Sequence, residues 1–333
     1  MTSWLNNISP GLAAAWHPVL RSSDLGETSR RIDLLGEPWV ITRLNGSITA
    51  FVDKCPHRNA RLSDGMVVGD TLQCPYHGWR FDGTGHCTLI PALGVGATVP
   101  PTAQLKPAHV TERYDLIWIA PETPRAEIID VAEWTDDSLH KVWMPAIDIN
   151  ATAAQFIDNF LDFGHFPFVH AGTFGSAEDS NISDYNVDKT NDGWGFIVDY
   201  PHSIANKEDP LVASGQHPLV QPRNMVYTFQ APFSANLHLE LPLTGVVNAI
   251  ATFCQPMTKS TTRLYTVMLR SDGASATAAQ AAIEYEYSVL QEDLVVIEHL
   301  WDNEIALGVG QAHSRADRNT VEFRRILARL LEP

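Results

Sequence analysis

The chain has 333 residues, which at about 150 residues per domain predicts two domains. Its hydrophobic content of 44% is enough for each domain to have a hydrophobic core. A formal net charge of −16 at pH 7 argues against a general nucleic-acid-binding protein. No apolar run approaches the length that spans a bilayer, and residues 1–17 lack a basic start followed by an apolar run. We therefore expect neither a membrane segment nor a signal peptide.

Short strands and tight turns are expected in the first third of the chain. Asn45-Gly46 separates two strand-like runs, Trp39–Arg43 and Ser47–Val52, and this dipeptide is a strong hairpin signal. A second turn is expected at Gly83-Thr84-Gly85. The pattern predicts β hairpins, with the two loops between these turns at hairpin tips.

Each of these two loops combines one Cys with one His. They read Cys55-Pro56-His57-Arg58 and Cys74-Pro75-Tyr76-His77-Gly78-Trp79. Two thiolates and two imidazoles fit a [2Fe–2S] cluster in which His replaces Cys on one iron, and neutral imidazole raises the cluster potential. Structural zinc, which also takes Cys and His, is the alternative. Because zinc fingers rarely begin with Cys-x-His, the sequence favours a cluster held by Cys55, His57, Cys74 and His77.

The remaining cysteines, Cys87 and Cys254, are far apart in the sequence. A total of four cysteines, two of them in the cluster motif, argues for a reducing, cytoplasmic setting. We expect Cys87 to be a small buried hydrophobic residue.

A linker is predicted at Pro121-Glu122-Thr123-Pro124, directly after the strand-like run Tyr114–Ala120. We therefore divide the chain into a cluster domain, residues 1–121, and a second domain, residues 122–333. The second domain mixes long helical patterns with strands such as Val226–Gln230 and Thr262–Leu269.

A second group of polar residues lies in an apolar segment near residue 160. Ala151–His165 is predicted to be a helix on which Asn159, Asp162 and His165 recur every three residues and share one stripe. Burying a polar group among apolar side chains costs several kcal/mol of folding free energy unless the group is hydrogen-bonded or binds a metal.

His170 follows His165 by five residues, about 140° round an ideal helix. Both imidazoles could face one ion only if the helix ends or distorts between them, and Gly164 and Pro167 provide such a break. If this segment stood alone, two ordinary buried histidines would be the better interpretation.

A third ligand is expected from the long helix predicted at Ala278–Leu307. Asp293 has only apolar helical neighbours, namely Val289, Leu290, Val296 and Ile297. A carboxylate on an inward stripe needs a partner, and a metal is a suitable one. Glu292 fits nearly as well, so periodicity alone leaves both acids open.

Taken together, the two cysteine–histidine motifs and the pattern Asn-x-x-Asp-x-x-His-x4-His resemble the Rieske non-heme iron oxygenases over nearly the whole chain. The chain is most similar to the short, α-only type represented by dicamba and vanillate O-demethylases. Respiratory Rieske loops carry an extra Cys each, where this chain has Ala60 and Tyr76.

The resemblance implies an α+β fold: an N-terminal Rieske β-domain followed by a helix-grip, START-like catalytic domain with an antiparallel sheet and long helices. It implies that His165, His170 and Asp293 bind a mononuclear Fe(II), since the family places an Asp in a Glu-Asp-x-x-x-x-Glu context. It further implies a homotrimer in which Asp162, with Asn159 beside it, connects the iron site to His77 of the neighbouring subunit.

The implied function is that of a terminal oxygenase. A ferredoxin or flavin reductase, itself supplied by NAD(P)H, would deliver two electrons for use with O2. We expect O- or N-demethylation of a small aromatic or heterocyclic substrate, with ring-hydroxylating (cis-dihydroxylating) dioxygenation as the alternative. Phe156, Phe160 and Phe163 suggest a bulky aromatic ligand, although core packing is the simpler explanation for any one of them.

The sequence argues against two other classes of protein. A pure electron carrier would not need the roughly 210 residues after the linker, and a binding protein would not need two histidines and an inward acid. Near the cluster loops lie four basic residues, Lys54, Arg58, Arg61 and Arg80. They could form a docking face for an acidic electron donor or be ordinary solvated side chains.

Overall fold

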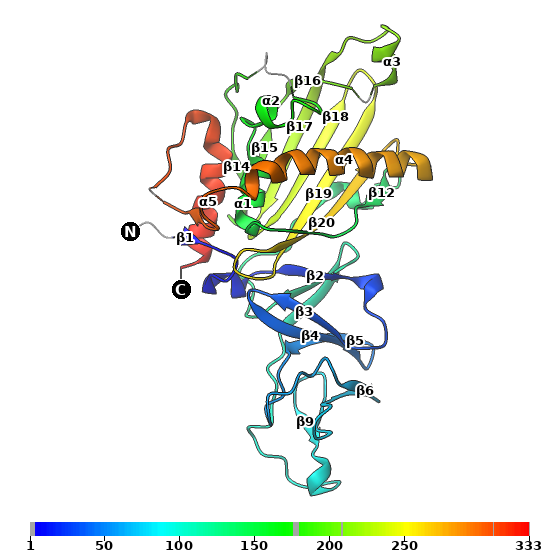
Figure 1. Cartoon of the computed structure of the whole chain (residues 1–333), viewed down its shortest axis with the longest axis vertical. Helices are drawn as coiled ribbons and strands as arrows, with labels where there is room; N and C mark the ends of the chain where they lie inside the picture. Colours follow the sequence, from blue (N-terminus) through cyan, green and yellow to red (C-terminus); the bar gives the residue numbers. More distant parts are fainter. Residues whose placement is uncertain (1–3, 176–179, 208, 309, 333) are drawn as a thin grey trace.

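A computed structural model describes residues 4–175, 180–207, 209–308 and 310–332 (Figure 1). A small β-rich part forms one end of the molecule, and a large antiparallel sheet crossed by a long helix, α4 (Ala276–Ile297), forms the other. Strand β1 (Trp4–Leu5) and helix α5 (Arg318–Leu330), near the two ends of the sequence, lie close together between these parts. This arrangement confirms the predicted α+β class.

Three small antiparallel sheets build the first part of the chain, in the strand orders β10-β11-β2, β3-β4-β5 and β6-β7-β8-β9. A short pair, β1 with β21, joins the two ends of the sequence. The strands are β1 (Trp4–Leu5), β2 (His17–Arg21), β3 (Arg30–Leu34), β4 (Glu37–Leu44), β5 (Ser47–Val52), β6 (Met66–Val68), β7 (Thr71–Gln73), β8 (Arg80–Phe81), β9 (Cys87–Leu89), β10 (His109–Arg113), β11 (Leu116–Ala120) and β21 (Ile305–Ala306).

The predicted hairpin between β4 and β5 is confirmed. Asn45 and Gly46 have φ angles of 49° and 74°, as a two-residue turn that matches the strand twist requires. The second cluster loop also connects paired strands, β7 and β8. The first cluster loop does not, because β5 and β6 belong to different sheets, so its predicted hairpin position is wrong. The Asp53 carboxylate instead ties this longer loop by accepting from the Ser63 N–H at 2.8 Å and hydroxyl at 2.6 Å.

The described part of the second domain contains a nine-stranded sheet ordered β12-β20-β19-β18-β17-β15-β14, with β13 on β20 and β16 on β17. Its strands are β12 (His140–Trp143), β13 (Ile147–Ile149), β14 (Asp188–Lys189), β15 (Gly195–Asp199), β16 (His202–Ala205), β17 (Val220–Gln230), β18 (Ser234–Leu241), β19 (Val246–Pro256) and β20 (Thr262–Arg270). Besides α4, the helices are α1 (Ala153–Leu161), α2 (Phe166–Val169), α3 (Pro210–Ala213) and α5 (Arg318–Leu330). Within the described ranges, none of the helices combines the length and apolarity needed to cross a membrane.

Both faces of this sheet are covered, as the side chains of β19 illustrate. Ile250 and Cys254 pack with helices α1 and α5 on one face, whereas Ala251 and Phe253 point to the other, as the two-residue strand period requires. On that second face Trp118 of β11 packs edge-on against Phe253, with ring centroids 5.3 Å apart. The two parts of the chain therefore share a core beside the expected boundary, and the division at residue 121 stays a prediction.

All four cysteines are free thiols and buried. Cys87 is fully buried in the apolar core of the cluster part, which confirms its predicted role as a small hydrophobic residue.

Helix α1 ends earlier than predicted. Thr152 and Gln155 form a capping box at its start, but the helix stops at Leu161 instead of continuing to His165. Asp162 adopts an extended conformation, and its carboxylate accepts from the backbone N–H of Gly164 and of His165, both at 3.0 Å. These bonds replace helical ones, so His165 precedes α2 and does not share a helical stripe with Asn159 and Asp162.

The other two helical predictions also need correction. Pro167 lies in the first turn of α2, where its missing N–H is tolerated, so it starts a helix and does not break one. Helix α4 ends at Ile297, ten residues before the predicted end. Glu298 directly follows the helix, and its carboxylate accepts a hydrogen bond from the Asn150 N–H at 2.7 Å. Local sequence patterns do not predict this tertiary contact.

A buried ion pair fastens α5 to α1. Arg324 donates to both carboxylate oxygens of Asp158, through Nη2 at 2.8 Å, and its side chain is 9% exposed. We expect Arg324→Met to lower the free energy of unfolding by about 2–3 kcal/mol, because it leaves a largely buried carboxylate unpaired. Urea denaturation measures this. Arg325→Met, whose side chain is 70% exposed, is the matched control and should change stability by less than about 1 kcal/mol. Equal losses would contradict the role given to the pair.

Candidate metal centres

The two cluster loops have the same backbone geometry. In each, the Cys N–H donates to the carbonyl five residues later, at 2.8 Å for both Cys55 and Cys74. In each loop the backbone N–H of the fourth residue after the Cys, Asn59 or Gly78, donates to the Cys carbonyl. Both of these residues have a positive φ, 58° at Asn59 and 70° at Gly78. Asn and Gly tolerate this left-handed conformation better than other residues. The two loops therefore hold their Cys and His side chains on equivalent backbone frames.

The four predicted cluster ligands come together in two pairs. The residues Cys55 and Cys74 are 1% and 2% exposed, and their thiols are neighbours. Burial, together with the Cys74 thiol, raises the pKa of Cys55 to about 11. The His57 and His77 rings lie outside them, with centroids 4.5 Å apart. His57 Nδ1 is buried without a hydrogen-bond partner. Two inner thiols, two outer imidazoles and an orphaned ring nitrogen fit a cluster with two Cys on one iron and two His on the other.

Aromatic rings fix the orientation of both imidazoles. The Trp79 ring stacks on His57 at 4.5 Å with an interplanar angle of 6°, and Tyr76 packs against His77 at 3.9 Å. The sequence motif contained both aromatic residues, but nothing in their spacing predicted these contacts.

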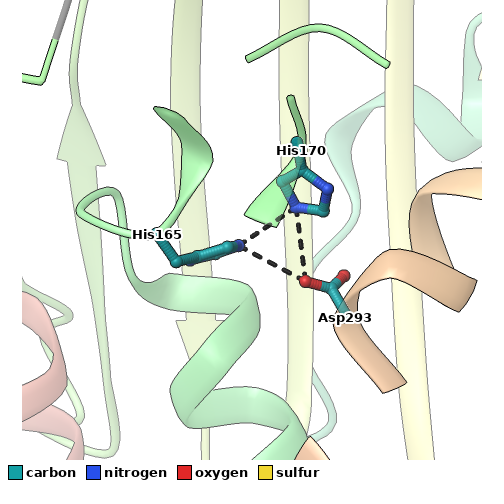
Figure 2. Close-up of side chains that lie close together, drawn as sticks. All are labelled: His165, His170 and Asp293. Carbon is teal, nitrogen blue, oxygen red and sulfur yellow. Dashed lines mark hydrogen bonds and ion pairs between the residues drawn. The ribbon is translucent and has the colours of Figure 1, made fainter. Parts of the chain in front are cut away.

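The second centre lies between the break after α1 and the face of α4 (Figure 2). His165 Nε2 is 3.1 Å from His170 Nε2, and Asp293 Oδ1 is 3.4 Å from the former and 3.3 Å from the latter. Ligands bound at about 2.1 Å and at right angles around one ion lie about 3 Å apart. The triangle therefore has the size of a two-histidine, one-carboxylate metal face.

Electrostatics at this triangle also favour a cation. Burial disfavours a charged imidazole, yet the hydrogen bonds to Asp162 and Asp293 outweigh it and raise the pKa of His165 to about 9. Burial alone would raise the pKa of Asp293, but the two imidazoles hold it well below its usual range. Two carboxylates thus place a negative potential at a buried point lined by nitrogen and oxygen donors, and a divalent cation would neutralise it.

A carboxylate also binds the outer nitrogen of each imidazole. Asp162 Oδ2 lies 3.1 Å from His165 Nδ1, and Glu292 Oε2 lies 3.0 Å from His170 Nδ1. Such partners select the tautomer whose inner nitrogen is free to bind metal. Glu292 also accepts from the Thr173 hydroxyl at 2.7 Å and therefore points away from the triangle, which the sequence could not decide.

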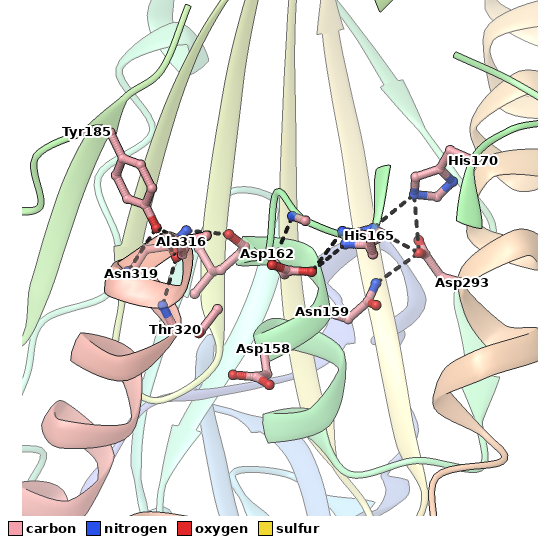
Figure 3. Close-up of polar contacts among 12 residues, drawn as sticks. Asp158, Asn159, Asp162, His165, His170, Tyr185, Asp293, Ala316, Asn319 and Thr320 are labelled. Carbon is pink, nitrogen blue, oxygen red and sulfur yellow. Dashed lines mark hydrogen bonds and ion pairs between the residues drawn. The ribbon is translucent and has the colours of Figure 1, made fainter. Parts of the chain in front are cut away.

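A wider polar network holds the ends of this site (Figure 3). Asn159 donates from Nδ2 to Asp293 Oδ1 at 2.9 Å. Asn319, at the start of α5, donates to the Leu161 carbonyl at the end of α1 and accepts from the Tyr185 hydroxyl at 2.9 Å. Leu161 directly precedes Asp162, whose carboxylate binds His165. The contacts of Asn319 therefore fix the backbone position of Asp162. Tyr185 and Asn319 were not predicted, since their partners are more than a hundred residues away.

The triangle opens into a cavity between the sheet and α4. Of the three aromatic residues predicted as ligand contacts, Phe156 and Phe160 line it. Phe163 does not line this cavity but stacks on Tyr200 in the core, with ring centroids 4.7 Å apart. Other lining residues are mostly apolar and include Phe166, Phe174, Ile204, Tyr227, Leu237, Leu239, Ile250, Leu264, Val289 and Leu290.

Comparison with known proteins decides the family. Residues 15–103 match the model of the Rieske [2Fe-2S] domain, and residues 149–333, more than half of the chain, match that of the vanillate O-demethylase oxygenase C-terminal domain. The chain is a Rieske oxygenase. This confirms the predicted family, and the two cofactors of the oxygenase are a Rieske [2Fe–2S] cluster and a mononuclear iron.

One similar protein spans nearly the whole oxygenase, and another matches about half of it. Methylxanthine N1-demethylase NdmA of Pseudomonas putida is 29% identical over 325 residues, 95% of this chain and 88% of the relative. The structure of NdmA from P. putida CBB5 with caffeine superimposes with a TM-score of 0.84 at 28% identity, over 96% of this chain and 91% of that one. The oxygenase component of dicamba O-demethylase from Stenotrophomonas maltophilia is 36% identical over 161 residues, 47% of each chain.

Proposed function

We propose that this oxygenase removes a methyl group from nitrogen or oxygen of a small, planar aromatic or heterocyclic substrate. The observation that carries the proposal is the opening of the His165–His170–Asp293 triangle into a largely apolar cavity lined by aromatic rings. Such a cavity holds a flat ring and excludes water from the reacting methyl group. The names of the relatives, demethylases acting on methylxanthine and on dicamba, support the same reaction.

We assign the residues of the two centres as follows. Cys55, His57, Cys74 and His77 hold the cluster, and His165, His170 and Asp293 hold Fe(II). Iron held this way supplies the activation of O2, because a facial triad leaves positions open. Asp162 and Glu292 keep the inner nitrogen of each imidazole available, and Asn159 orients the Asp293 carboxylate.

The overall reaction balances as hydroxylation followed by collapse. A methyl C–H next to nitrogen or oxygen becomes C–OH, and the adduct releases formaldehyde and leaves N–H or O–H on the ring. One methyl-bearing substrate, O2, two electrons and two protons thus give the demethylated product, formaldehyde and water. Two electrons per turnover must come from a separate donor, which we propose to be a ferredoxin or flavin reductase.

Electrons reach the catalytic iron from a neighbouring subunit in this proposal. The second cluster loop connects β7 and β8 in the sheet that also contains β6 and β9, at one end of the molecule, and the triangle lies beside α2 and α4 toward the other end (Figure 1). His77 is exposed, and Asp162 lines an open groove together with Leu300 and Trp301, the last 97% exposed. An exposed apolar patch beside a buried polar connection suits a subunit contact, and we propose that this contact builds a head-to-tail trimer. The four free cysteines support a reducing, cytoplasmic location.

A product analysis tests the reaction. Chemically reduced holoenzyme would receive O2 and a panel of methoxy-, N-methyl- and unsubstituted aromatic compounds, and products would be identified by mass spectrometry. We expect loss of one CH2 unit with an equal amount of formaldehyde. Gain of two oxygens and two hydrogens on an intact methylated ring would instead establish ring dihydroxylation and refute the demethylase proposal.

The basic residues near the cluster provide a test of donor docking. Lys54, Arg58 and Arg61 are exposed, whereas Arg80 is half-buried and donates to Gln73 at 2.9 Å. If the three exposed residues guide an acidic donor, cluster reduction should slow by about tenfold or more between 0.02 M and 0.5 M salt, measured by stopped-flow absorbance. Arg61→Gln should weaken this dependence and Arg315→Gln, far along the chain, should not. A salt-independent rate would exclude the docking face.

A further inference from the structure

Asn248 places an unsatisfied polar atom in the cavity that the triangle opens into. It lies on β19, lines that cavity and is 9% exposed. Its Oδ1 atom is buried and has no hydrogen-bond partner. Buried carbonyl oxygens in folded proteins nearly always accept a hydrogen bond from protein, water or a ligand. An orphaned acceptor that faces a ligand-sized cavity therefore indicates where a ligand donor belongs.

The position of Asn248 is remote from the iron site. Asn248 pairs across the sheet with Arg270, the last residue of β20, and α4 begins six residues later at Ala276. Asp293 lies toward the other end of that helix. Glu286 and Asp293, both lining the cavity, are seven residues apart on α4, which is about 10 Å along the helix axis. The cavity is thus long enough for a ring system with a methyl group at one end and a polar edge at the other.

Charge in the cavity favours a neutral ligand. Apart from the metal site, its charged side chains are Arg223, Arg270 and Glu286. Asp272 binds the Arg270 guanidinium through both carboxylate oxygens, at 2.8 and 2.9 Å, and Arg223 Nε donates to the His202 ring at 2.9 Å. Asp272 therefore pairs with Arg270, and Arg223 binds a histidine ring. The two acids Glu286 and Asp272 equal the two guanidinium groups in number, which favours a neutral substrate over an anionic one.

We infer that Asn248 determines specificity by accepting a hydrogen bond from the ring N–H of a neutral, planar, methylated lactam. A carboxamide carries an acceptor and a donor side by side, so its natural complement is a ring N–H beside a ring C=O. The inference rests on the proposed demethylation and adds the chemistry of the distal substrate edge. Phe160 and Tyr227 supply the aromatic walls against which such a ring would pack.

Two matched probe pairs test the inference by calorimetric binding to anaerobic holoenzyme. Theobromine and 1-methyluracil carry a lactam N–H, and caffeine and 1,3-dimethyluracil carry N–CH3 at the same atom. We expect the N–H member of each pair to bind the natural protein about tenfold tighter or more. In Asn248→Leu this preference should fall to about twofold or less. Asn248→Asp keeps an acceptor and should keep the preference.

Several outcomes would overturn the inference. Equal binding within each pair would mean that Asn248 holds only water, and an unchanged preference in Asn248→Leu would assign recognition elsewhere. Tighter binding of 2-methoxybenzoate than of either N–H probe, or no binding of those probes, would exclude the lactam class. If Asn248→Leu fails to fold, Asn248→Ala takes its place, checked by circular dichroism. Formaldehyde release without an N–H preference would refute this inference alone, whereas N–H-selective binding with methyl groups left intact would refute the proposed demethylation.

Discussion

Replacement of Asp293 by Ala is expected to remove the mononuclear iron and to lower turnover by roughly 1,000-fold or more, while the cluster spectrum stays unchanged. Asp293 Oδ1 is the only carboxylate oxygen of the triangle and lies within 3.4 Å of both inner imidazole nitrogens. Without it, two nitrogens remain, which is too few to hold Fe(II) against water. Metal analysis, visible absorbance of the cluster and single-turnover product yield measure the three effects separately.

Glu292→Gln is the matched control for this prediction, since it changes the adjacent acid on the same helix. Its carboxylate supports His170 from the outer nitrogen, so we expect a loss of about 10–100-fold in iron affinity or activity. Gln keeps an oxygen for the Thr173 hydroxyl, which limits structural damage. The assignment would be reversed if Glu292→Gln lost its iron completely and Asp293→Ala retained it.

Replacement of Cys74 by Ser should abolish the cluster and all turnover that depends on an external electron donor. The two buried thiols occupy the inner position between matching loops, and loss of one removes a ligand for which oxygen is a poor substitute. The mononuclear iron should remain, because its three ligands come from other parts of the fold. Visible absorbance and electron paramagnetic resonance of the reduced protein would show the loss.

Cys87→Ala provides the comparison within the same domain. Cys87 is fully buried in the core of the cluster part, so the change is expected to cost about 1 kcal/mol of stability and to leave the cluster intact. Visible absorbance and metal analysis of the natural protein also test the zinc alternative. Colourless natural protein with stoichiometric zinc at this site would contradict the iron–sulfur assignment.

Local chemistry made the metal-binding motifs predictable from sequence. The spacing of the four cluster ligands within two short loops limits the possible metal groups; the ligands are Cys55, His57, Cys74 and His77. The hairpin between β4 and β5 was predictable because the dipeptide Asn45-Gly46 favours its two-residue turn. The pairing of His165 and His170 as iron ligands came from the family resemblance, because the segment alone favours two ordinary buried histidines. The structure places each of these side chains next to its expected partner.

Helix ends and supporting contacts were harder to predict, because tertiary contacts decide them. The end of α1 depends on the Asp162 carboxylate turning back onto its own backbone, and the end of α4 coincides with the contact from Glu298 to Asn150. The apolar neighbours of Asp293 were also misleading, because Val296 is 44% exposed in the chain. What separates Asp293 from Glu292 is the direction of each carboxylate, which hydrophobic periodicity does not contain.

Residues that complete the site had no sequence signal at all. Asn319 and Arg324 on α5 act on α1 across more than 150 residues of sequence, and α5 itself has no counterpart among the predicted elements. Asn248 lies on β19, which was not among the strands predicted from the sequence. Such contacts become visible only when the sheet and the helices are assembled.

The most direct test of the account is oxidation of a trideuterated methyl group. Reduced holoenzyme would receive O2 and a ring compound with an N–CD3 group, and formaldehyde and ring products would be measured together by mass spectrometry. The account predicts dideuterated formaldehyde in an amount equal to the demethylated ring, and none from Asp293→Ala. A ring product that keeps its CD3 group and gains two oxygens, or equal yields from the natural protein and Asp293→Ala, would contradict it.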